Sequence, residues 1–236
     1  MADLNINIGD TMPESKRIHV SLVWRYERLA LDWLVRRVPA SVTPDMLTAF
    51  GTFGSAVTLV GYGLTWVSPA FLWLASFGLF IHWLGDSLDG NLARHRKIER
   101  PRYGYFLDQT VDVVGNLLIA LGMAISPFVR AEVALFALAG YHMLSIYVFV
   151  RAYVSREFHV AVFNSGPTEI RLMIVAMNML ILVFGAASFD LLGMQVSWCD
   201  IAMSLLGLGF MVAFANLVFV YAKELRQADE DARAGF

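Results

Sequence analysis

Residues 70–92 read AFLWLASFGLFIHWLGDSLDGNL, and residues 103–126 read YGYFLDQTVDVVGNLLIALGMAIS. Each segment is long enough to cross about 30 Å of hydrocarbon as a helix, because such a span takes about 20 residues. A short basic loop at 94–102 joins the two segments. The pair therefore predicts two antiparallel, neighbouring helices inside a membrane.

The composition of the whole chain agrees with a membrane protein. Of its 236 residues, 58% are hydrophobic and 16% are charged, whereas a soluble domain has about 25% charged residues. The apolar content excludes a disordered chain, and a single cysteine, Cys199, excludes a disulfide scaffold. A formal net charge of −2 gives no case for nucleic-acid binding.

Six apolar segments are predicted to span the membrane, and the fold class is therefore all-α and polytopic. The predicted spans are 45–67, 70–92, 103–126, 130–154, 168–188 and 198–222. Four prolines at the ends of these segments suit helix starts: Pro44, Pro69, Pro127 and Pro167.

The lysines and arginines predict the orientation of these spans. If the N-terminus is cytoplasmic, 17 of the 18 lysines and arginines fall in inner segments, and only Arg130 falls outside. Cytoplasmic loops carry an excess of these residues. Both termini are therefore expected in the cytoplasm.

The segment that precedes the first span is too charged to cross a membrane. Within 14–38, one arc of a helix carries mostly charged residues and the adjoining arc carries apolar residues that include Leu29 and Trp33. This pattern predicts an amphipathic surface helix, which either anchors the chain at acidic lipids or packs on the cytoplasmic face of the bundle. The predicted organisation is an N-terminal segment at 1–43, one six-helix catalytic domain at 44–223, and a short cytoplasmic tail at 224–236.

Four aspartates lie in or at the edge of two apolar spans. Asp86 and Asp89 are three residues apart, and Asp108 and Asp112 are four apart, so each pair projects from one face of its helix. An ionised aspartate at the centre of a spanning helix costs about 2.5–3.5 kcal/mol, so such residues are normally functional. Four converging carboxylates repel one another unless protons or cations neutralise them, and their oxygens suit Mg²⁺ or Mn²⁺.

The residues around the acids indicate a phosphate ligand. Gly90 and Gly104 lie at the loop ends of the two helices, where a missing side chain lets a nucleotide approach the backbone. Arg94 can bind phosphate oxygens through two parallel hydrogen bonds. Together with the acids, these residues predict a metal-bridged pyrophosphate site.

The residues from Asp86 to Asp112 resemble the signature of the CDP-alcohol phosphotransferases. The match consists of Asp86-Ser-Leu-Asp89-Gly90-Asn-Leu-Ala93-Arg94, nine further residues, and Gly104-Tyr-Phe-Leu-Asp108-Gln-Thr-Val-Asp112. Eight fixed positions coincide, and the six spans with a preceding amphipathic helix match the family over nearly the whole chain.

The resemblance implies an integral-membrane enzyme of phospholipid synthesis. Such an enzyme passes a substituted phosphate from a CDP-linked donor to an alcohol acceptor and releases CMP. By position, Asp86, Asp89, Asp108 and Asp112 would bind two divalent ions, and Asp112 would also be the base for the acceptor hydroxyl. Four residues would border the CDP: Gly90, Ala93, Arg94 and Gly104. Members of the family are often homodimers, so a homodimer is expected by analogy.

Two departures from the family pattern occur. Nine residues separate Arg94 from Gly104, where about eight is commoner, and this changes the loop but not the spacing within either helix. The first span begins Thr43-Pro44-Asp45-Met46-Leu47-Thr48, where relatives often have Pro-Asn and a following Thr. Thr48 is carried over as a neighbour of the nucleotide, and the role of Asp45 stays open.

His82 and Asn116 extend the line of acids by one helical turn at either end. His82 lies four residues before Asp86, and Asn116 lies four residues after Asp112. Each either orients a carboxylate or bonds a neighbouring helix away from the site.

The residues around the second inner loop do not decide which class of alcohol is the acceptor. Four charged residues gather around it: Arg151, Arg156, Glu169 and Arg171. In relatives with phosphorylated acceptors, arginines in this region hold the acceptor phosphate, which favours CDP-diacylglycerol as donor. The Thr168-Glu169 pair resembles the choline and ethanolamine phosphotransferase branch, which favours a lipid acceptor and a CDP-amino-alcohol donor.

The competing functional class is a cation or proton transporter, because acids inside a membrane also mark ion pathways. Transporter acids usually lie near the midplane on broken helices, whereas these acids crowd the ends of two helices beside glycines and Arg94. The enzyme is therefore favoured, with its site facing the cytoplasm of a bacterial inner membrane or an equivalent lipid-synthesising membrane.

Overall fold

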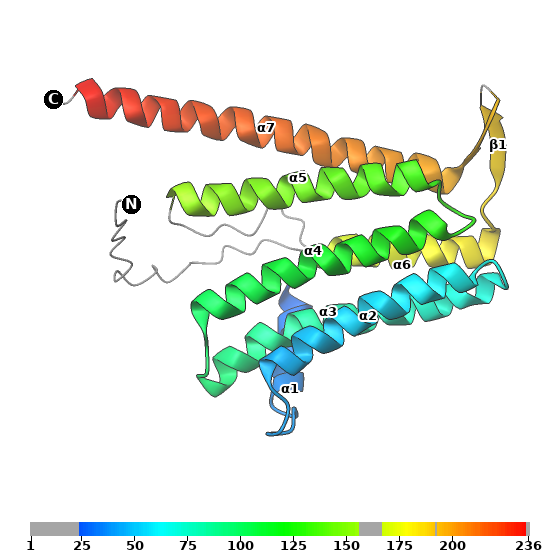
Figure 1. Cartoon of the computed structure of the whole chain (residues 1–236), viewed down its shortest axis with the longest axis horizontal. Coiled ribbons are helices and arrows are strands. Elements are labelled where there is room, and N and C mark those ends of the chain that lie inside the picture. Colours follow the sequence, from blue (N-terminus) through cyan, green and yellow to red (C-terminus); the bar gives the residue numbers. More distant parts are fainter. Residues whose placement is uncertain (1–23, 156–166, 192, 235–236) are drawn as a thin grey trace, which may run out of the picture.

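The computed structural model describes residues 24–155, 167–191 and 193–234. Within these residues, six helices are long and apolar enough to cross a membrane, which confirms the predicted fold class (Figure 1). The described elements are α1 (Trp24–Val35), α2 (Pro44–Leu64), a 3₁₀ turn (Pro69–Phe71), α3 (Leu72–Arg96), α4 (Pro101–Ile125), α5 (Ala131–Ser155), α6 (Pro167–Phe184), β1 (Ser188–Leu191), β2 (Met194–Ser197) and α7 (Trp198–Ala234).

The helix starts follow the prolines with one exception. Proline opens α2, the 3₁₀ turn before α3, α4 and α6, and the side chain of Thr43 accepts a hydrogen bond from the backbone N–H of Met46 at the start of α2. The predicted start at Pro127 is wrong. This proline lies in the turn after α4, and α5 begins at Ala131.

Several predicted spans end at other residues: α2 stops at Leu64, short of residue 67, and α3 continues to Arg96, past residue 92. Helix α6 stops at Phe184, short of residue 188, because Gly185 adopts a left-handed conformation with φ of 74°. An antiparallel hairpin of β1 and β2 follows, in which Ser188 pairs with Ser197. Helix α7 continues past residue 222 to Ala234, so the predicted tail is largely helical.

Helices α2 and α3 pack with their backbones in close contact. A Cβ atom at Gly85 would lie 2.4 Å from the backbone nitrogen of Gly51, and one at Gly54 would lie 2.4 Å from that of His82. Only glycine permits this approach, which is typical of helix pairs in membranes. The contact brings Thr48 on α2 beside Asp89 on α3.

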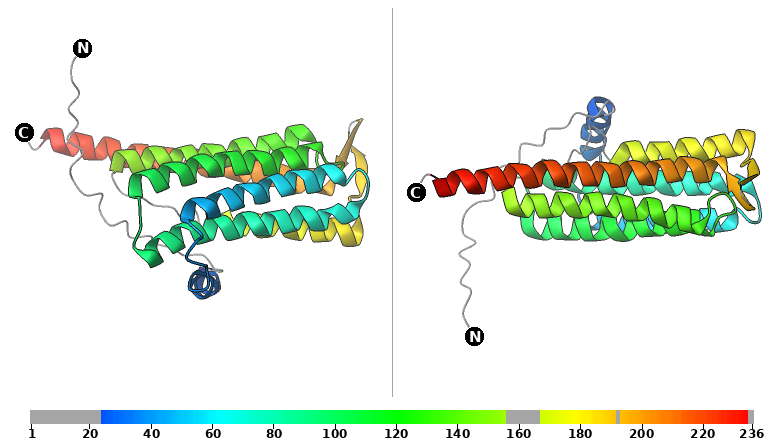
Figure 2. Two further views of the ribbon diagram at one scale, coloured as in Figure 1. Left: turned by 60° about the horizontal axis from the view of Figure 1, so that its bottom comes forward. Right: turned by 90° about the horizontal axis from the view of Figure 1, so that it is seen from above.

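Helix α1 lies crosswise on the side of the bundle (Figure 2). Its Leu31 and Val35 are buried in a cluster with α2 and α3, so the described part of the predicted surface helix packs on the bundle. Leu29 and Trp33 remain 63% and 56% exposed, which shows that the predicted apolar arc is not the packed face. Residues 14–23 of that predicted helix lie outside the described residues. Contact with acidic lipids stays a prediction.

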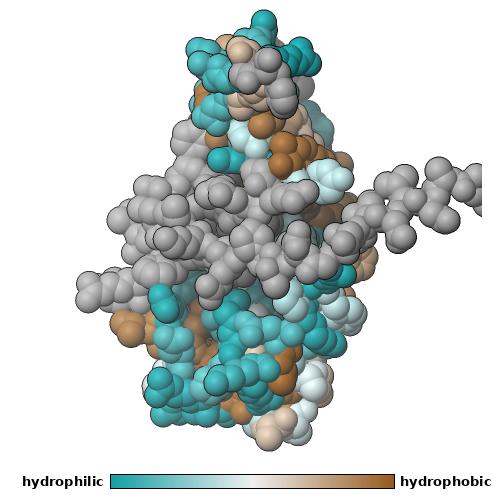
Figure 3. All heavy atoms as spheres, turned by 90° about the vertical axis from the view of Figure 1, so that its left-hand side faces the viewer, coloured by the Kyte–Doolittle hydropathy of each residue, from teal (hydrophilic) through white to brown (hydrophobic). Residues whose placement is uncertain are grey.

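One end of the bundle is hydrophilic. The connection between α3 and α4 lies there, and hydrophilic residues gather over the lower part of this face (Figure 3). Lys97 ends α3 in a left-handed conformation, and the guanidinium of Arg96 donates hydrogen bonds to the backbone carbonyls of Val38, Pro39 and Val42. The four aspartates lie in the halves of α3 and α4 nearest the connection between these helices.

Candidate functional site

The predicted acids line a small cavity between α2, α3 and α4. Its lining consists of Thr48, Gly51, Thr52, His82, Asp86, Asp89, Asp108, Val111 and Asp112. Helix α2 contributes through Thr48 and Thr52, which are four residues apart and therefore share one face. All four predicted aspartates thus come together at one place.

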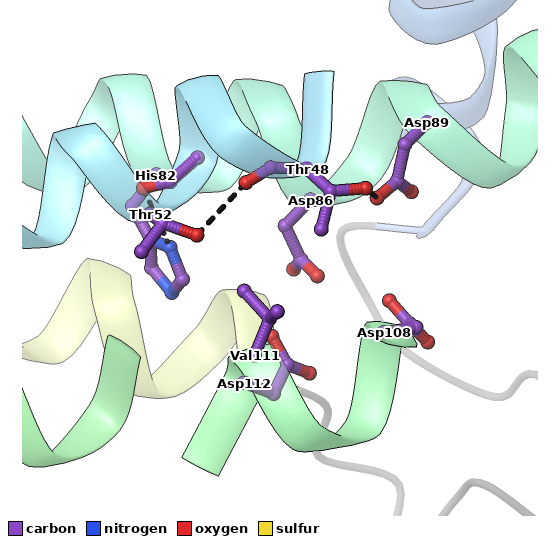
Figure 4. A pocket seen from close by; sticks show the side chains of 9 residues that line it. Thr48, Thr52, His82, Asp86, Asp89, Asp108, Val111 and Asp112 are labelled. Atoms are coloured by element: carbon purple, nitrogen blue, oxygen red, sulfur yellow. Dashed lines mark hydrogen bonds between the residues drawn. The ribbon is translucent and has the colours of Figure 1, made fainter. Parts of the chain in front are cut away.

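Three of the four carboxylates form a tight group. One oxygen each from Asp86, Asp108 and Asp112 lies within 4.8 Å of the others. Figure 4 shows Asp86 pointing from α3 toward Asp112 on α4, with Asp108 one turn away. This spacing allows the three carboxylates to share a cation.

Asp89 lies in the same cavity but outside that group of three. It is buried, and its Oδ2 accepts a hydrogen bond of 2.6 Å from the hydroxyl of Thr48 (Figure 4). Its Oδ1 accepts a second bond, of 2.5 Å, from the backbone N–H of Gly90. These two donors fix the orientation of the carboxylate.

Arg171 provides a buried positive charge beside the acids. Its Nη2 donates to Oδ2 of Asp86 at 2.7 Å and to Nε2 of His82 at 3.2 Å. The residue is only 8% exposed. The sequence pattern groups Arg171 with the cations of the inner loops; in the structure it lies in α6 and pairs with Asp86 of the aspartate cluster.

The donor set fits a hard divalent cation. Carboxylate oxygens are the ligands that Mg²⁺ and Mn²⁺ prefer, and both ions commonly take further ligands from substrate phosphates. Arg171 pairs with Asp86, and a bound cation would reduce the repulsion among the three converging carboxylates.

The predicted CDP neighbours lie at the helix ends beside the cavity, except Thr48, which lines it. Arg94 is exposed and donates to the side chain of Asn91 at 2.8 Å. A Cβ atom at Gly90 would lie 3.4 Å from the Arg94 guanidinium, and one at Gly104 would meet nothing within 4 Å. Ala93 is half-buried on the last turns of α3.

The described acceptor candidates lie on two helices, with Arg151 on α5 and Glu169 and Arg171 on α6. The guanidinium of Arg151 on α5 lies over the ring of Tyr221 on α7, 4.9 Å from its centroid. Glu169 is half-buried in the first turn of α6, and Arg156 lies outside the described residues. The neighbouring Thr168 donates to Glu27 of α1, which also accepts from the indole of Trp83.

A second and larger cavity lies among α4, α5, α6 and α7. Its walls are mostly apolar and include Ala120, Met123, Ala137 and Met203. Its polar lining consists of Asn116, Tyr141 and Arg171. Arg171 therefore connects this apolar cavity to the aspartate cluster, and Asn116 belongs to this cavity and not to the acidic one.

Comparison with known proteins identifies the same family as the signature at residues 86–112. The sequence model of the family described as CDP-alcohol phosphatidyltransferase matches residues 41–219. The chain is 40% identical over 90 residues to a phosphatidylinositol phosphate synthase of Cutibacterium acnes, covering 36% of this chain and 39% of the relative.

Two further relatives are transferases according to their names. Cholinephosphotransferase 1 of Danio rerio is 27% identical over 203 residues, covering 80% of this chain and 51% of the relative. A CDP-diacylglycerol–serine O-phosphatidyltransferase of Encephalitozoon cuniculi is 33% identical over 124 residues, covering 46% of this chain and 32% of the relative. The chain thus spans about half or less of the length of these relatives. Because the family model covers most of the chain, the protein belongs to the CDP-alcohol phosphatidyltransferase family.

Proposed function

We propose that this protein transfers a substituted phosphate from a CDP-linked donor to an alcohol acceptor and releases CMP. The observation that carries the proposal is the convergence of Asp86, Asp108 and Asp112 within 4.8 Å, in a membrane-spanning bundle of this family. A cation or proton transporter would not need three converging carboxylates beside a sequence signature that borders a nucleotide in this family.

In this proposal Asp86, Asp89, Asp108 and Asp112 hold two divalent ions. When bound, these ions would neutralise the charge on the leaving phosphate and help to align the in-line attack. Thr48 supports Asp89 through its hydrogen bond. Gly90, Ala93, Arg94 and Gly104 border the CDP, at the end of the bundle that we propose to face the cytoplasm.

Asp112 is the proposed base. It removes the proton of the acceptor hydroxyl while the acceptor oxygen forms a bond to the phosphorus that carries the donor's own alcohol. The bond from that phosphorus to the bridging oxygen breaks, and CMP leaves with that oxygen. Asp112 suits this role because it lies on α4 in the cavity, across from the ion pair of Asp86 and Arg171.

The larger cavity suits the hydrocarbon chain of a glycerolipid. Its mostly apolar lining matches this chemistry, and its polar residue Arg171 lies at the acids. Both candidate reactions include such a lipid, as CDP-diacylglycerol in one and as the acceptor in the other. The cavity therefore supports a lipid substrate without choosing between the two reactions.

Filling this cavity is expected to change the preference for chain length. Ala120→Phe places a ring in the cavity from α4, so kcat/KM for a long-chain lipid should fall about tenfold more than for a short-chain analogue. Leu117→Phe is the matched control, because Leu117 lies on the same helix, does not line the cavity and is 39% exposed. Equal losses for both chain lengths in Ala120→Phe would show that the cavity does not hold the chain.

Arg151 tests the class of acceptor. If the acceptor carries a phosphate that Arg151 holds, Arg151→Ala should raise the acceptor KM about tenfold and leave kcat within about twofold. The control is Tyr221→Leu, which removes the ring under the guanidinium and keeps the charge. An unchanged acceptor KM would argue against a phosphate pocket at Arg151 and favour a lipid acceptor.

A panel of substrates tests the proposed function. Purified protein is incubated with CDP-diacylglycerol or CDP-amino-alcohol donors, each crossed with soluble alcohols, phosphorylated alcohols and diacylglycerol. We expect CMP release with one class of donor, accompanied by a phospholipid product that mass spectrometry identifies. Absence of CMP release from every pairing would overturn the proposal.

A further inference from the structure

We infer that His82 is a positioning residue that holds Arg171 on Asp86 and so fixes the aspartate cluster for its cation. The inference rests on the proposed function of the cluster as a metal site. It assigns a role to a side chain on α3, one turn before Asp86, that lies outside the family signature.

The imidazole ring lies between three helices. It is only 2% exposed. Its Nδ1 lies 3.2 Å from the backbone carbonyl oxygen of Gly51 on α2, and its Nε2 lies 3.2 Å from Nη2 of Arg171 on α6. The same Nη2 lies 2.7 Å from Oδ2 of Asp86. A continuous line of hydrogen bonds therefore joins α2 to the aspartate cluster through His82.

The chemistry of the partners fixes the direction of each bond. A carbonyl oxygen only accepts, so Nδ1 of His82 carries the proton and donates to Gly51. A guanidinium only donates, so Nε2 of His82 must accept from Arg171. One neutral tautomer satisfies both contacts, and a ring with protons on both nitrogens would place an N–H against Arg171.

Close packing keeps the ring in this orientation. A Cβ atom at Gly115 on α4 would lie 3.0 Å from Cε1 of the ring, and one at Gly54 on α2 would lie 2.4 Å from the backbone nitrogen of His82. Helix α4 can approach the edge of the ring because residue 115 has no side chain, and Gly54 lets α2 approach the backbone of His82. These contacts leave the ring little room to turn.

Holding Arg171 matters because this side chain borders two cavities. It lines the large apolar cavity and also contacts Asp86 in the acidic one. A long side chain without a second partner could turn toward the apolar cavity and release Asp86 from its orientation. A carboxylate bonded through one oxygen keeps lone pairs for a cation, so a fixed Arg171 orients Asp86 without blocking it.

Two substitutions of His82 separate positioning from simple packing. His82→Asn keeps a donor near the place of Nδ1 and loses the acceptor for Arg171, whereas His82→Gln carries an amide oxygen to the place of Nε2 and keeps that acceptor. Binding of Mn²⁺ alone to purified protein, followed by the electron paramagnetic resonance signal of free Mn²⁺, provides a measurement independent of turnover. We expect the Mn²⁺ dissociation constant to rise at least about tenfold in His82→Asn and less than about threefold in His82→Gln.

A glycine pair on α4 provides a second test that leaves the chemistry of His82 unchanged. Gly115→Ala adds a methyl group 3.0 Å from both the His82 ring and the Ser55 hydroxyl, and Gly122→Ala, two turns further along the same helix, adds one 3.0 Å from the Leu59 backbone and the Tyr62 side chain. Only Gly115→Ala should weaken Mn²⁺ binding by about tenfold. If His82→Asn does not fold, the comparison of Gly115→Ala with Gly122→Ala still tests whether His82 positions Arg171.

The inference is overturned if His82→Asn and His82→Gln change Mn²⁺ binding equally or not at all, or if Gly115→Ala behaves like Gly122→Ala. Failure of the proposed function gives a different result. In that case the wild-type protein binds Mn²⁺ with the expected effects of His82 but releases no CMP from any donor.

Discussion

Asp112→Asn is expected to reduce CMP release at least about 100-fold while the protein remains folded. Asparagine has nearly the same shape as aspartate but cannot accept the proton of the acceptor hydroxyl. It also removes one of the three carboxylates that lie within 4.8 Å of one another, so the cation would lose a charged ligand. The measurement is CMP release by the purified variant under saturating donor and acceptor.

The folded state of this variant is checked by its elution as a single species and by its thermal unfolding in detergent. Removing one of several like charges should not lower the unfolding temperature, because the remaining repulsion is smaller. The matched control is Asp45→Asn, whose carboxylate is exposed and pairs with Arg100 outside the cavity. Turnover of Asp112→Asn at the rate of this control would remove Asp112 from the mechanism.

Arg171→Leu is expected to have the largest effect on stability. Arg171 and Asp86 form a mostly buried ion pair, with side chains 9% and 19% exposed. Removing one partner leaves the other charge without compensation, which costs about 3–5 kcal/mol of unfolding free energy. We expect a large fall in the thermal unfolding temperature in detergent and a loss of CMP release.

A double variant tests whether the broken ion pair of Arg171 and Asp86 causes the loss of stability. Arg171→Leu combined with Asp86→Asn removes both charges, so much of the lost stability should return while CMP release stays absent. Arg171→Leu with the unfolding temperature of the wild-type protein would contradict the assignment of Arg171 as the partner of Asp86.

The four aspartates could be predicted from the sequence because their constraints are local. Spacings of three and four residues place each pair on one helical face, and the short loop at 94–102 makes the two helices neighbours. The prolines likewise marked most helix starts, since each is fixed by its own φ angle. The predicted roles of Gly90, Ala93, Arg94 and Gly104 remain proposals.

The partner of Asp86 could not be predicted in this way. Arg171 is 85 residues away in the chain, and a basic residue near a loop has the same pattern whether it faces solvent or a buried acid. Thr52 was missed in the cavity, although its position one turn after Thr48 could have indicated it. The hairpin after α6 was also missed, because Ala186 and Ala187 continue the apolar segment beyond Gly185 to the start of β1.

Metal-dependent release of CMP is the most direct test of the central claim, that the aspartate cluster holds divalent ions for transfer from a CDP-linked donor. Purified protein is assayed with its best donor and acceptor, first with a chelator and then with added Mg²⁺ or Mn²⁺. We predict that the chelator abolishes CMP release and that one of these ions restores it in the wild-type protein but not in Asp112→Asn. CMP release that continues in the chelator, or that never occurs with any donor, would contradict the claim.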